Sequence, residues 1–373
     1  MSFSGVVLAN AETGMKSKKA CVLHKICGRE LVNWVIDALK DAGAEKIAVI
    51  GSDADKVSEN TDVPKSDLTV VVNGAAPLVR SETIAAAVKY HTENESGFTV
   101  ISGNGNVIGV IVNGSDIFAD TESMINAYEG KKSEYIAVGE GITVTDRVQL
   151  SRAERAMHDR IIEQHMLNGV TIRFPESVYI EYGVEIGADT EISGSAELLS
   201  GTKIGENCII GYGSRLDNAV IGDDVDILSS VILNSEIESG THVGPFAYVR
   251  PNCKVGKNVK VGDFVEIKNS VIDDGTKISH LTYIGDSDVG KNVNFGCGTV
   301  TCNYDGKKKF RSRIGDNTFV GCNTNLVSPV DVGDRSYIAA GSTITNDIPE
   351  GSLSIARARQ VNKEGWADEH KKY

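Results

Sequence analysis

The sequence is poor in several kinds of residue, and each scarcity excludes a class of protein. Aromatic residues make up only 6% of the 373 residues, and there are 7 prolines and 2 tryptophans. Because no run of about 18 apolar residues occurs, no membrane-spanning helix is expected. The N-terminal segment has no basic region followed by a long apolar one, so it does not read as a secretory signal peptide.

Cysteine and positive charge are also limited. The 7 cysteines are an odd number without the spacing of a disulfide framework, which is typical of reduced thiols and favours a cytoplasmic protein. Acidic residues outnumber basic ones by 51 to 38, and the net charge of −13 argues against non-specific binding to nucleic acid. A phosphorylated substrate would therefore need a local cluster of basic side chains.

What the sequence does contain is a six-residue repeat that runs through its second half. An aliphatic residue followed by glycine recurs at multiples of six, as at Val255–Gly256 and Val261–Gly262. This period predicts a parallel β-helix in which six residues form each flat face. We expect the aliphatic residue to point into the prism and the glycine to occupy a tight corner at positive φ. With three faces in each coil, residues 172–349 hold about ten coils.

The remaining segments define the domain organisation. Residues 1–146 alternate apolar strands with an amphipathic helix at 31–42 and predict an α/β domain. Residues 147–170 read as a linker arm with an exposed helix, for which Ser151 and Glu154 form a plausible capping box. The β-helix is assigned to residues 171–350, and a C-terminal tail to residues 351–373.

Part of the repeat carries basic and hydrogen-bonding residues that a β-helix does not require. They are Arg250, Lys268, His280, Tyr283, Asn294, Asn303, Tyr304 and Lys309. Because Arg250 and Lys268 are one coil of 18 residues apart, they should stack on the same face. A histidine can take a proton from an amine near pH 7, and arginine and lysine can donate charge-assisted hydrogen bonds to a phosphate.

Two further features of this region bear on its chemistry. Residues 297–314 contain no aliphatic–glycine pair and include the turn-forming string CNYDGKKK, so we expect a loop that leaves the prism. Cys297 and Cys302 are too isolated from other ligand types to indicate zinc, and no metal site is predicted.

Residues 151–366 resemble the acetyltransferase domain of the bacterial bifunctional N-acetylglucosamine-1-phosphate uridyltransferase/glucosamine-1-phosphate N-acetyltransferase family. The strings HLTYIGD, TCNYDG, AGSTIT and KEGW carry the resemblance. It implies a left-handed β-helix, acetyl-CoA as co-substrate, glucosamine 1-phosphate as acceptor and no metal in acetyl transfer. It also implies a homotrimer with its sites between neighbouring prisms.

The same resemblance implies a role for each matching residue. His280 would be the general base. The residues that would bind the sugar phosphate are Arg250, Lys268, Tyr283, Asn294 and Lys309. The residues that would contact acetyl-CoA are Cys297, Asn303, Tyr304, Cys322, Ala340 and Arg357. Cys322 stands where the family leads us to expect serine, which would weaken a hydroxyl contact to the cofactor.

Residues 1–146 resemble the uridyltransferase half of that family, which has a nucleotide-diphospho-sugar transferase fold. This half is shorter here than in the family, and its differences fall on the positions that carry the chemistry. In Leu8–Met15 one residue of the family's phosphate loop is lost, its leading glycines and its arginine are missing, and Glu12 would repel phosphates. Cys21 replaces an expected lysine, and Asn104 replaces the metal-binding aspartate. We expect that this half is truncated, that uridylyl transfer is lost and that the domain serves as a structural cap or a regulatory module.

The leading hypothesis is a monofunctional glucosamine-1-phosphate N-acetyltransferase. Its product, N-acetylglucosamine 1-phosphate, would be used to make UDP-N-acetylglucosamine and peptidoglycan precursors. One alternative is an enzyme that retains both activities. Another is a non-catalytic protein that binds CoA or a nucleotide-sugar. A third is an acyltransferase for another amino-sugar phosphate or acyl group.

Overall fold

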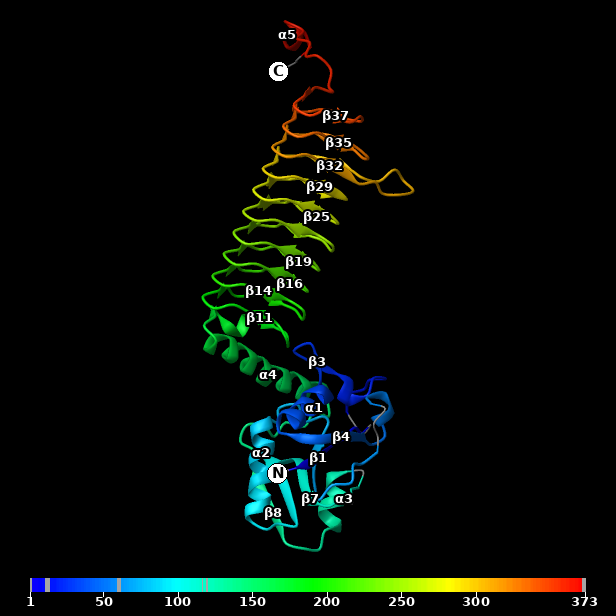
Figure 1. The fold of residues 1–373 in the computed structure, drawn as a ribbon, viewed down its shortest axis with the longest axis vertical. Coiled ribbons are helices and arrows are strands. Elements are labelled where there is room, and N and C mark those ends of the chain that lie inside the picture. Colours follow the sequence, from blue (N-terminus) through cyan, green and yellow to red (C-terminus); the bar gives the residue numbers. More distant parts are fainter. Residues whose placement is uncertain (1, 11–13, 59–61, 116, 119, 371–373) are drawn as a thin grey trace. The chain divides into compact units, whose positions relative to one another are not determined.

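A computed structural model describes residues 2–10, 14–58, 62–115, 117–118 and 120–370 (Figure 1). Contacts divide the chain into two compact units, one of Met1–Gln164 with Ile180–Tyr182 and one of His165–Tyr179 with Gly183–Tyr373. None of the helices in these ranges combines the length and the hydropathy that a bilayer crossing requires. The two units are described separately below.

The first unit is an α/β domain built on a six-stranded sheet of order β4-β1-β5-β7-β6-β8. The strands are β1 (Phe3–Leu8), β4 (Ala44–Ile50), β5 (Leu68–Asn73), β6 (Phe98–Gly103), β7 (Asn106–Asn113) and β8 (Lys132–Ile136). The other elements are η1 (Cys21–Leu23), β2 (Lys25–Ile26), β3 (Arg29–Glu30), α1 (Leu31–Asp41), η2 (Ala54–Lys56), α2 (Ser81–Glu93) and α3 (Thr121–Ala127). Strand β1 is parallel to β4 and β5, whereas β7 is antiparallel to β5 and β6.

Both faces of this sheet are buried, because successive residues of its strands point to opposite sides. Val70 and Val72 belong to the larger core, which includes α1 and α2, and Val71 belongs to the smaller core with Met124 of α3. The predicted helix at 31–42 is confirmed as α1, and Gly43 follows it at φ +95° as a C-terminal cap.

The arm helix α4 spans Arg147–Leu167 and differs from the prediction in two respects. Ser151 lies within the helix rather than at its N-cap, because the side chain of Asp146 caps it by accepting a hydrogen bond from Gln149 N at 2.8 Å. The helix is also not exposed all round, since Ala153 and Met157 are buried in the larger core of the first unit. These buried residues explain why the first unit extends to Gln164 rather than ending at residue 146.

The second unit is a left-handed parallel β-helix with three sheets of short strands (Figure 1). The first sheet contains β9 (Thr171–Ile172), β12 (Glu191–Ile192), β15 (Ile209–Ile210), β18 (Asp226–Ile227), β21 (His242–Val243), β24 (Lys260–Asp263), β27 (Lys277–His280), β30 (Asn294–Phe295), β33 (Phe319–Val320), β36 (Tyr337–Ile338) and β38 (Leu353–Ser354). The second contains β10 (Tyr179–Ile180), β13 (Glu197–Leu198), β16 (Arg215–Asp217), β19 (Val231–Leu233), β22 (Tyr248–Val249), β25 (Glu266–Lys268), β28 (Tyr283–Gly285), β31 (Val300–Cys302), β34 (Asn325–Val327) and β37 (Thr343–Ile344). The third contains β11 (Glu185–Ile186), β14 (Lys203–Ile204), β17 (Val220–Ile221), β20 (Glu236–Ile237), β23 (Lys254–Val255), β26 (Val271–Ile272), β29 (Ser287–Val289), β32 (Ser312–Ile314) and β35 (Asp331–Val332).

Two short helices accompany the β-helix, η3 (Pro175–Ser177) near its start and α5 (Trp366–His370) near the end of the chain. Strand β38 pairs with β36 through Tyr337 and Leu353, so the first sheet continues beyond residue 350, where the sequence suggested that the β-helix ends. The last described residues, 355–370, are exposed.

The positive φ expected of the repeated glycines is found at Gly244 (φ +111°) but is wrong for most of them. Gly187 and Gly205 do not have positive φ; the left-handed residues stand two positions later, at Asp189 and Asn207. A Cβ atom on Gly187 would instead lie 2.5 Å from the carbonyl carbon of Gly205 in the next coil. Glycine is therefore required by the close approach of adjacent coils.

Buried hydroxyl groups also join one coil to the next. Thr241 Oγ1 donates to Gly256 O at 2.7 Å and accepts from Val259 N at 3.0 Å, while its own residue is fully buried. Ser235 and Thr276 make equivalent bridges. These side chains satisfy buried backbone groups at the corners and fix the register in which outward-facing residues stack.

Candidate active site

One corner of the prism carries many of the predicted site residues. Here the chain turns from the first sheet into the second, and successive coils place Asp263, His280, Cys297, Cys322 and Ala340 above one another. Backbone hydrogen bonds join the coils at this turn, from Asn323 N to Cys297 O and from Gly341 N to Cys322 O, both 2.8 Å. We call this column the active corner.

Arg357 lies at the far end of the active corner. A Cβ atom on Gly341 would be 3.6 Å from Arg357 Cδ, so the arginine stem passes over the coil that contains Ala340. The structure thus brings together four of the six residues predicted to contact acetyl-CoA, namely Cys297, Cys322, Ala340 and Arg357.

His280 is at the end of β27, where it pairs with a residue that sequence reasoning missed. Its Nδ1 lies 2.6 Å from Oδ1 of Asp263, its register partner on β24. The hydrogen bond to His280 is the main cause that lowers the pKa of the Asp263 carboxyl. Since an ionised carboxylate can only accept, Nδ1 carries the proton and Nε2 is the basic nitrogen. No described residue forms a hydrogen bond with Nε2.

Three cationic side chains form a cluster at the second sheet, into which the active corner leads: Arg250, Lys268 and, from the protruding loop, Lys309. Arg250 and Lys268 occupy equivalent positions in adjacent coils, as predicted, and Arg250 Nη1 is paired with Glu266 Oε1 at 2.8 Å. The pKa of Lys268 is lowered, chiefly by its contact with Lys309 and then by desolvation and the charge of Arg250. Such a cluster of like charges disfavours its own ionisation and would be stabilised by an anion.

Tyr283 and Asn303 meet above this cluster. The Asn303 side chain is only 6% exposed, and its Nδ2 donates to Asp286 Oδ2 at 2.6 Å and lies 3.4 Å from the Tyr283 hydroxyl. Gly285 makes this contact possible, since a Cβ atom there would lie 2.6 Å from Asn303 Nδ2. Gly285 and Asp286 were missed because their function is to position neighbours rather than to present reactive groups.

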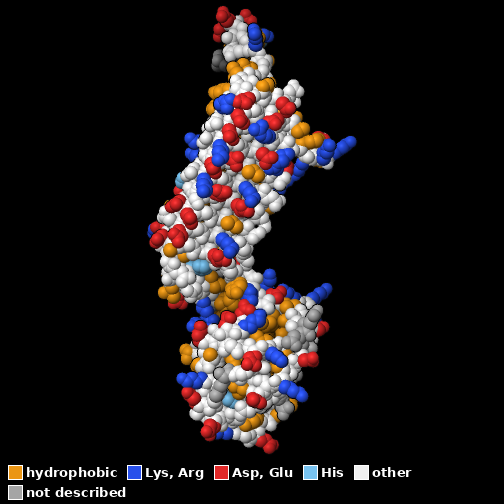
Figure 2. Space-filling view, in the orientation of Figure 1, with side chains coloured by type: hydrophobic (Ala, Val, Ile, Leu, Met, Phe, Trp, Pro, Cys, Tyr) orange, Lys and Arg blue, Asp and Glu red, His pale blue; other side chains and the backbone are white. Residues whose placement is uncertain are grey.

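The loop expected within residues 297–314 is present and leaves the prism between β31 and β32 (Figure 1). A bridge between Tyr304 and Lys309 closes it, and Asp305 Oδ1 accepts hydrogen bonds from the backbone of Lys307 and Lys308. In Figure 2 the protruding loop ends in basic side chains. Tyr304 is exposed, and its hydroxyl donates to Gly306 O, so it belongs to the loop rather than to the active corner.

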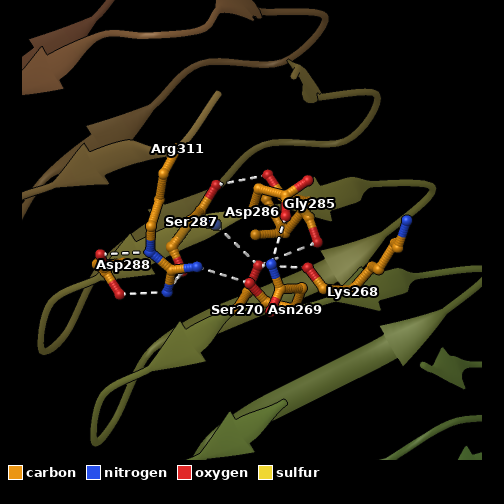
Figure 3. Close-up of polar contacts among 9 residues, drawn as sticks. Lys268, Asn269, Ser270, Gly285, Asp286, Ser287, Asp288 and Arg311 are labelled. Atoms are coloured by element: carbon orange, nitrogen blue, oxygen red, sulfur yellow. Dashed lines mark hydrogen bonds and ion pairs between the residues drawn. The ribbon is translucent and has the colours of Figure 1, made fainter. Parts of the chain in front are cut away.

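Arg311 clamps the end of this loop to the coils beneath it (Figure 3). Its guanidinium forms an ion pair with Asp288 and donates to Asn269 O and Ser287 O. The pairing lowers the pKa of Asp288 and raises that of Arg311. Since Arg311 is two residues beyond Lys309, the clamp fixes where the loop returns its lysine to the basic cluster.

Not every predicted substrate residue lies on one face of the prism. Asn294 begins β30 in the first sheet, where it stacks between Lys277 and Phe319. Arg250, Lys268 and Tyr283 are associated with the second sheet. A ligand that contacts both groups must therefore reach around the active corner or lie between two prisms.

The altered residues Cys21 and Asn104 of the first unit are themselves uncharged. Cys21 is buried, its Sγ donates to Val144 O at 3.1 Å, and burial raises its pKa to about 11, so it carries no charge near pH 7. Asn104 is exposed in the turn between β6 and β7 at φ +49°. The described residues include no group of three or more His, Cys, Asp or Glu side chains that could hold a metal ion. Glu12 lies outside the described residues.

The lowered pKa of Lys268 leads to a testable prediction. A larger fraction of this amine is neutral at mildly alkaline pH, so an amine-acylating reagent should modify Lys268 faster than Lys203, which pairs with Glu185 elsewhere on the prism. Substituting Lys309→Met should slow modification of Lys268, and inorganic phosphate should slow it in the wild type. Mass spectrometry of modified peptides measures both rates. Equal rates at Lys268 in the wild type and the variant would contradict this electrostatic account.

Comparisons with known proteins agree with this architecture. The bacterial transferase hexapeptide family (six repeats) matches residues 183–218, 234–269 and 311–346. The bifunctional protein GlmU of Acetivibrio thermocellus is 44% identical, with 97% of this chain and 96% of that protein covered. The bifunctional protein GlmU of Clostridioides difficile is 40% identical, with 99% and 98% covered.

Solved structures match less closely. A UDP-N-acetylglucosamine acyltransferase from Campylobacter jejuni covers 49% of this chain and 70% of its own, with 19% identity and a TM-score of 0.33. That likeness is too weak to support an argument, whereas the sequence relatives align over nearly their whole lengths. The chain therefore belongs to the family of transferases represented by the bifunctional protein GlmU.

Proposed function

We propose that the β-helix transfers an acetyl group from acetyl-CoA to the amine of glucosamine 1-phosphate. The observation that carries this proposal is the position of His280 in the active corner. The active corner leads into the second sheet, where the basic cluster of Arg250, Lys268 and Lys309 lies, and the column that begins at Cys297 runs above His280. A general base must lie where the acceptor amine and the thioester meet. The product, N-acetylglucosamine 1-phosphate, would serve UDP-N-acetylglucosamine synthesis in the cytoplasm.

The acceptor would bind by its charge. A phosphate dianion relieves the repulsion between Lys268 and Lys309 and accepts charge-assisted hydrogen bonds from them and from Arg250. Tyr283 and Asn294 would contact the sugar hydroxyls. This local cluster overcomes the net charge of −13, which would otherwise repel a phosphorylated substrate.

The transfer itself requires one base and no acyl-enzyme. Acetyl-CoA supplies the acetyl group as an activated thioester. His280 Nε2 takes the proton that the amine loses as its nitrogen bonds to the acetyl carbon, and the C–S bond breaks to release CoA. A positioned base of this kind contributes roughly 10²–10⁴-fold to the rate.

The active corner beyond His280 suits an extended cofactor. Its outward residues, Cys297, Cys322 and Ala340, are small, and Arg357 at the far end would pair with the anionic groups of acetyl-CoA. Asn303 and Tyr304 would contact the cofactor from the side. Cys322 is exposed, and because a thiol is a weaker hydrogen-bond donor than a hydroxyl, it would hold the cofactor less firmly than the expected serine.

We further propose that the functional unit is a homotrimer with a site between copies. Phe246, Phe264 and Leu281 are exposed along the active corner in the left-handed conformation, at φ +60°, +55° and +43°. The two phenylalanine rings stack with centroids 5.5 Å apart. This backbone conformation costs roughly 1–2 kcal/mol for each non-glycine residue. An apolar ladder maintained at such a cost next to His280 is suited to burial against another copy.

For the first unit we propose that uridylyl transfer has been lost. Cys21 and Asn104 present neutral groups where the family's pattern has a lysine and a metal-binding aspartate. The alignment with the Acetivibrio relative runs over 445 positions, more than the 373 residues of this chain, so that relative has segments absent here. The bifunctional name of the relatives favours the opposite outcome, which the second experiment below distinguishes.

The acetyltransferase proposal is tested by CoA release from acetyl-CoA in the presence of glucosamine 1-phosphate. We expect turnover by the wild type, and a decrease in kcat of roughly 10²–10⁴-fold for His280→Ala because the base is lost. His242→Ala is the matched control, since His242 also pairs with an aspartate on the first sheet but lies outside the active corner. Absence of turnover in the folded wild type would overturn the proposal and leave a CoA-binding role to be tested by calorimetry.

The loss of uridylyl transfer is tested by pyrophosphate release from UTP and N-acetylglucosamine 1-phosphate with Mg²⁺. No release above background is expected, because the phosphate-binding and metal-binding groups are neutral. Acetyl transfer by the same preparation shows that the protein is active. UDP-N-acetylglucosamine formation by the purified chain would contradict the proposal and establish a bifunctional enzyme.

A further inference from the structure

Resting on the proposed acetyl transfer, we infer that Asp263 is a positioning residue for His280. It fixes the tautomer in which Nδ1 carries the proton and Nε2 accepts the proton of the amine. Asp263 contacts neither substrate in this account and acts only through the imidazole.

The positions of Asp263 and His280 are fixed by the strand register and by a backbone hydrogen bond between their coils. Asp263 and His280 face each other in the register of β24 and β27, with 2.6 Å between Oδ1 and Nδ1. The backbone ties the same positions together, because Leu281 N donates to Asp263 O at 2.9 Å. Since the two strands cannot slide without breaking the coil register, the imidazole has a fixed partner before any substrate binds.

Charge gives this contact its chemical effect. A neutral imidazole has two tautomers, and a carboxylate selects the one that donates from Nδ1. When Nε2 takes the proton, the resulting imidazolium lies beside a negative charge. The other charged groups on these two strands are Lys260 and Lys277, while β30 above presents the uncharged Asn294 and Phe295. Because the Asp263 side chain is 38% exposed, solvent screens part of the attraction.

The chain contains a matched pair outside the site. His242 Nδ1 lies 2.8 Å from Asp226 Oδ2, and these residues face each other on β21 and β18 of the same sheet. The two pairs have similar N–O separations and similar exposure, but only the His280–Asp263 contact is also a hydrogen bond. The His242 pair also lies outside the active corner. Asp226→Ala therefore controls for the loss of a histidine–aspartate ion pair between coils.

The test compares Asp263→Ala, Asp263→Asn and Asp226→Ala in the full chain. We expect kcat of Asp263→Ala to fall about 10–100-fold, with KM for both substrates changed less than about twofold. The kcat of Asp263→Asn should fall less than that of Asp263→Ala, because Oδ1 of the amide still accepts a hydrogen bond from His280 Nδ1. Asp226→Ala should retain wild-type kcat.

Nitrogen-15 NMR of the ring provides a readout that does not depend on activity. His280 should show the Nδ1-protonated tautomer in the wild type and shift toward the Nε2-protonated one in Asp263→Ala. Unchanged kcat, or lower kcat with an unchanged tautomer, would overturn the positioning role while acetyl transfer stands. A wild type without acetyl transfer would instead overturn the proposed function, and this role with it.

Discussion

The backbone hydrogen bonds between adjacent coils determine everything that the β-helix presents to solvent. Adjacent coils donate hydrogen bonds to each other in both directions, as from Gly187 N to Ile204 O of the next coil and from Asn323 N to Cys297 O of the preceding one. Buried hydroxyls such as that of Thr241 complete the pairing. Because the interior is filled by aliphatic side chains and glycine permits coils to approach closely, the register cannot slip without exposing the core. Residues distant in sequence therefore stack with fixed spacing, and a site can be built along one edge.

The proposed acetyl transfer would use that edge together with the sheet that follows it. His280 has a defined basic nitrogen because Asp263 occupies the equivalent position one coil below. The basic cluster lies at the adjoining sheet. The Arg311 clamp anchors the end of the loop that carries Lys309 (Figure 3). The apolar ladder of Phe246, Phe264 and Leu281 follows the same corner, so the surface suited to another copy and the catalytic groups are continuous.

The sequence predicted the architecture well because a six-residue period has one simple structural solution. The stacking of Arg250 on Lys268 and the protruding loop also followed from counting. A fixed count of 18 residues per coil gives the wrong stacking partners where coils differ in length. Arg215 faces Val231 after 16 residues, Asp263 faces His280 after 17 and Asn294 faces Phe319 after 25. A step of 18 from Lys268 leads to residue 286, whereas the structure has Gly285 opposite Lys268. The sequence period did not predict the pairing of Asp263 with His280, nor the close approach of adjacent coils that requires glycine. Both depend on distances between side chains and backbone in three dimensions.

In the proposed trimer, acetyl transfer would take place where two copies meet, with Lys268 from the second sheet of one copy and Asn294 from the first sheet of another. Co-expression of Lys268→Ala with Asn294→Ala tests this arrangement, because random mixing in a trimer leaves about a quarter of the inter-copy sites intact. We expect each variant alone to be nearly inactive and the mixed protein to recover about a quarter of wild-type CoA release. No recovery in a mixed trimer of confirmed composition would contradict it.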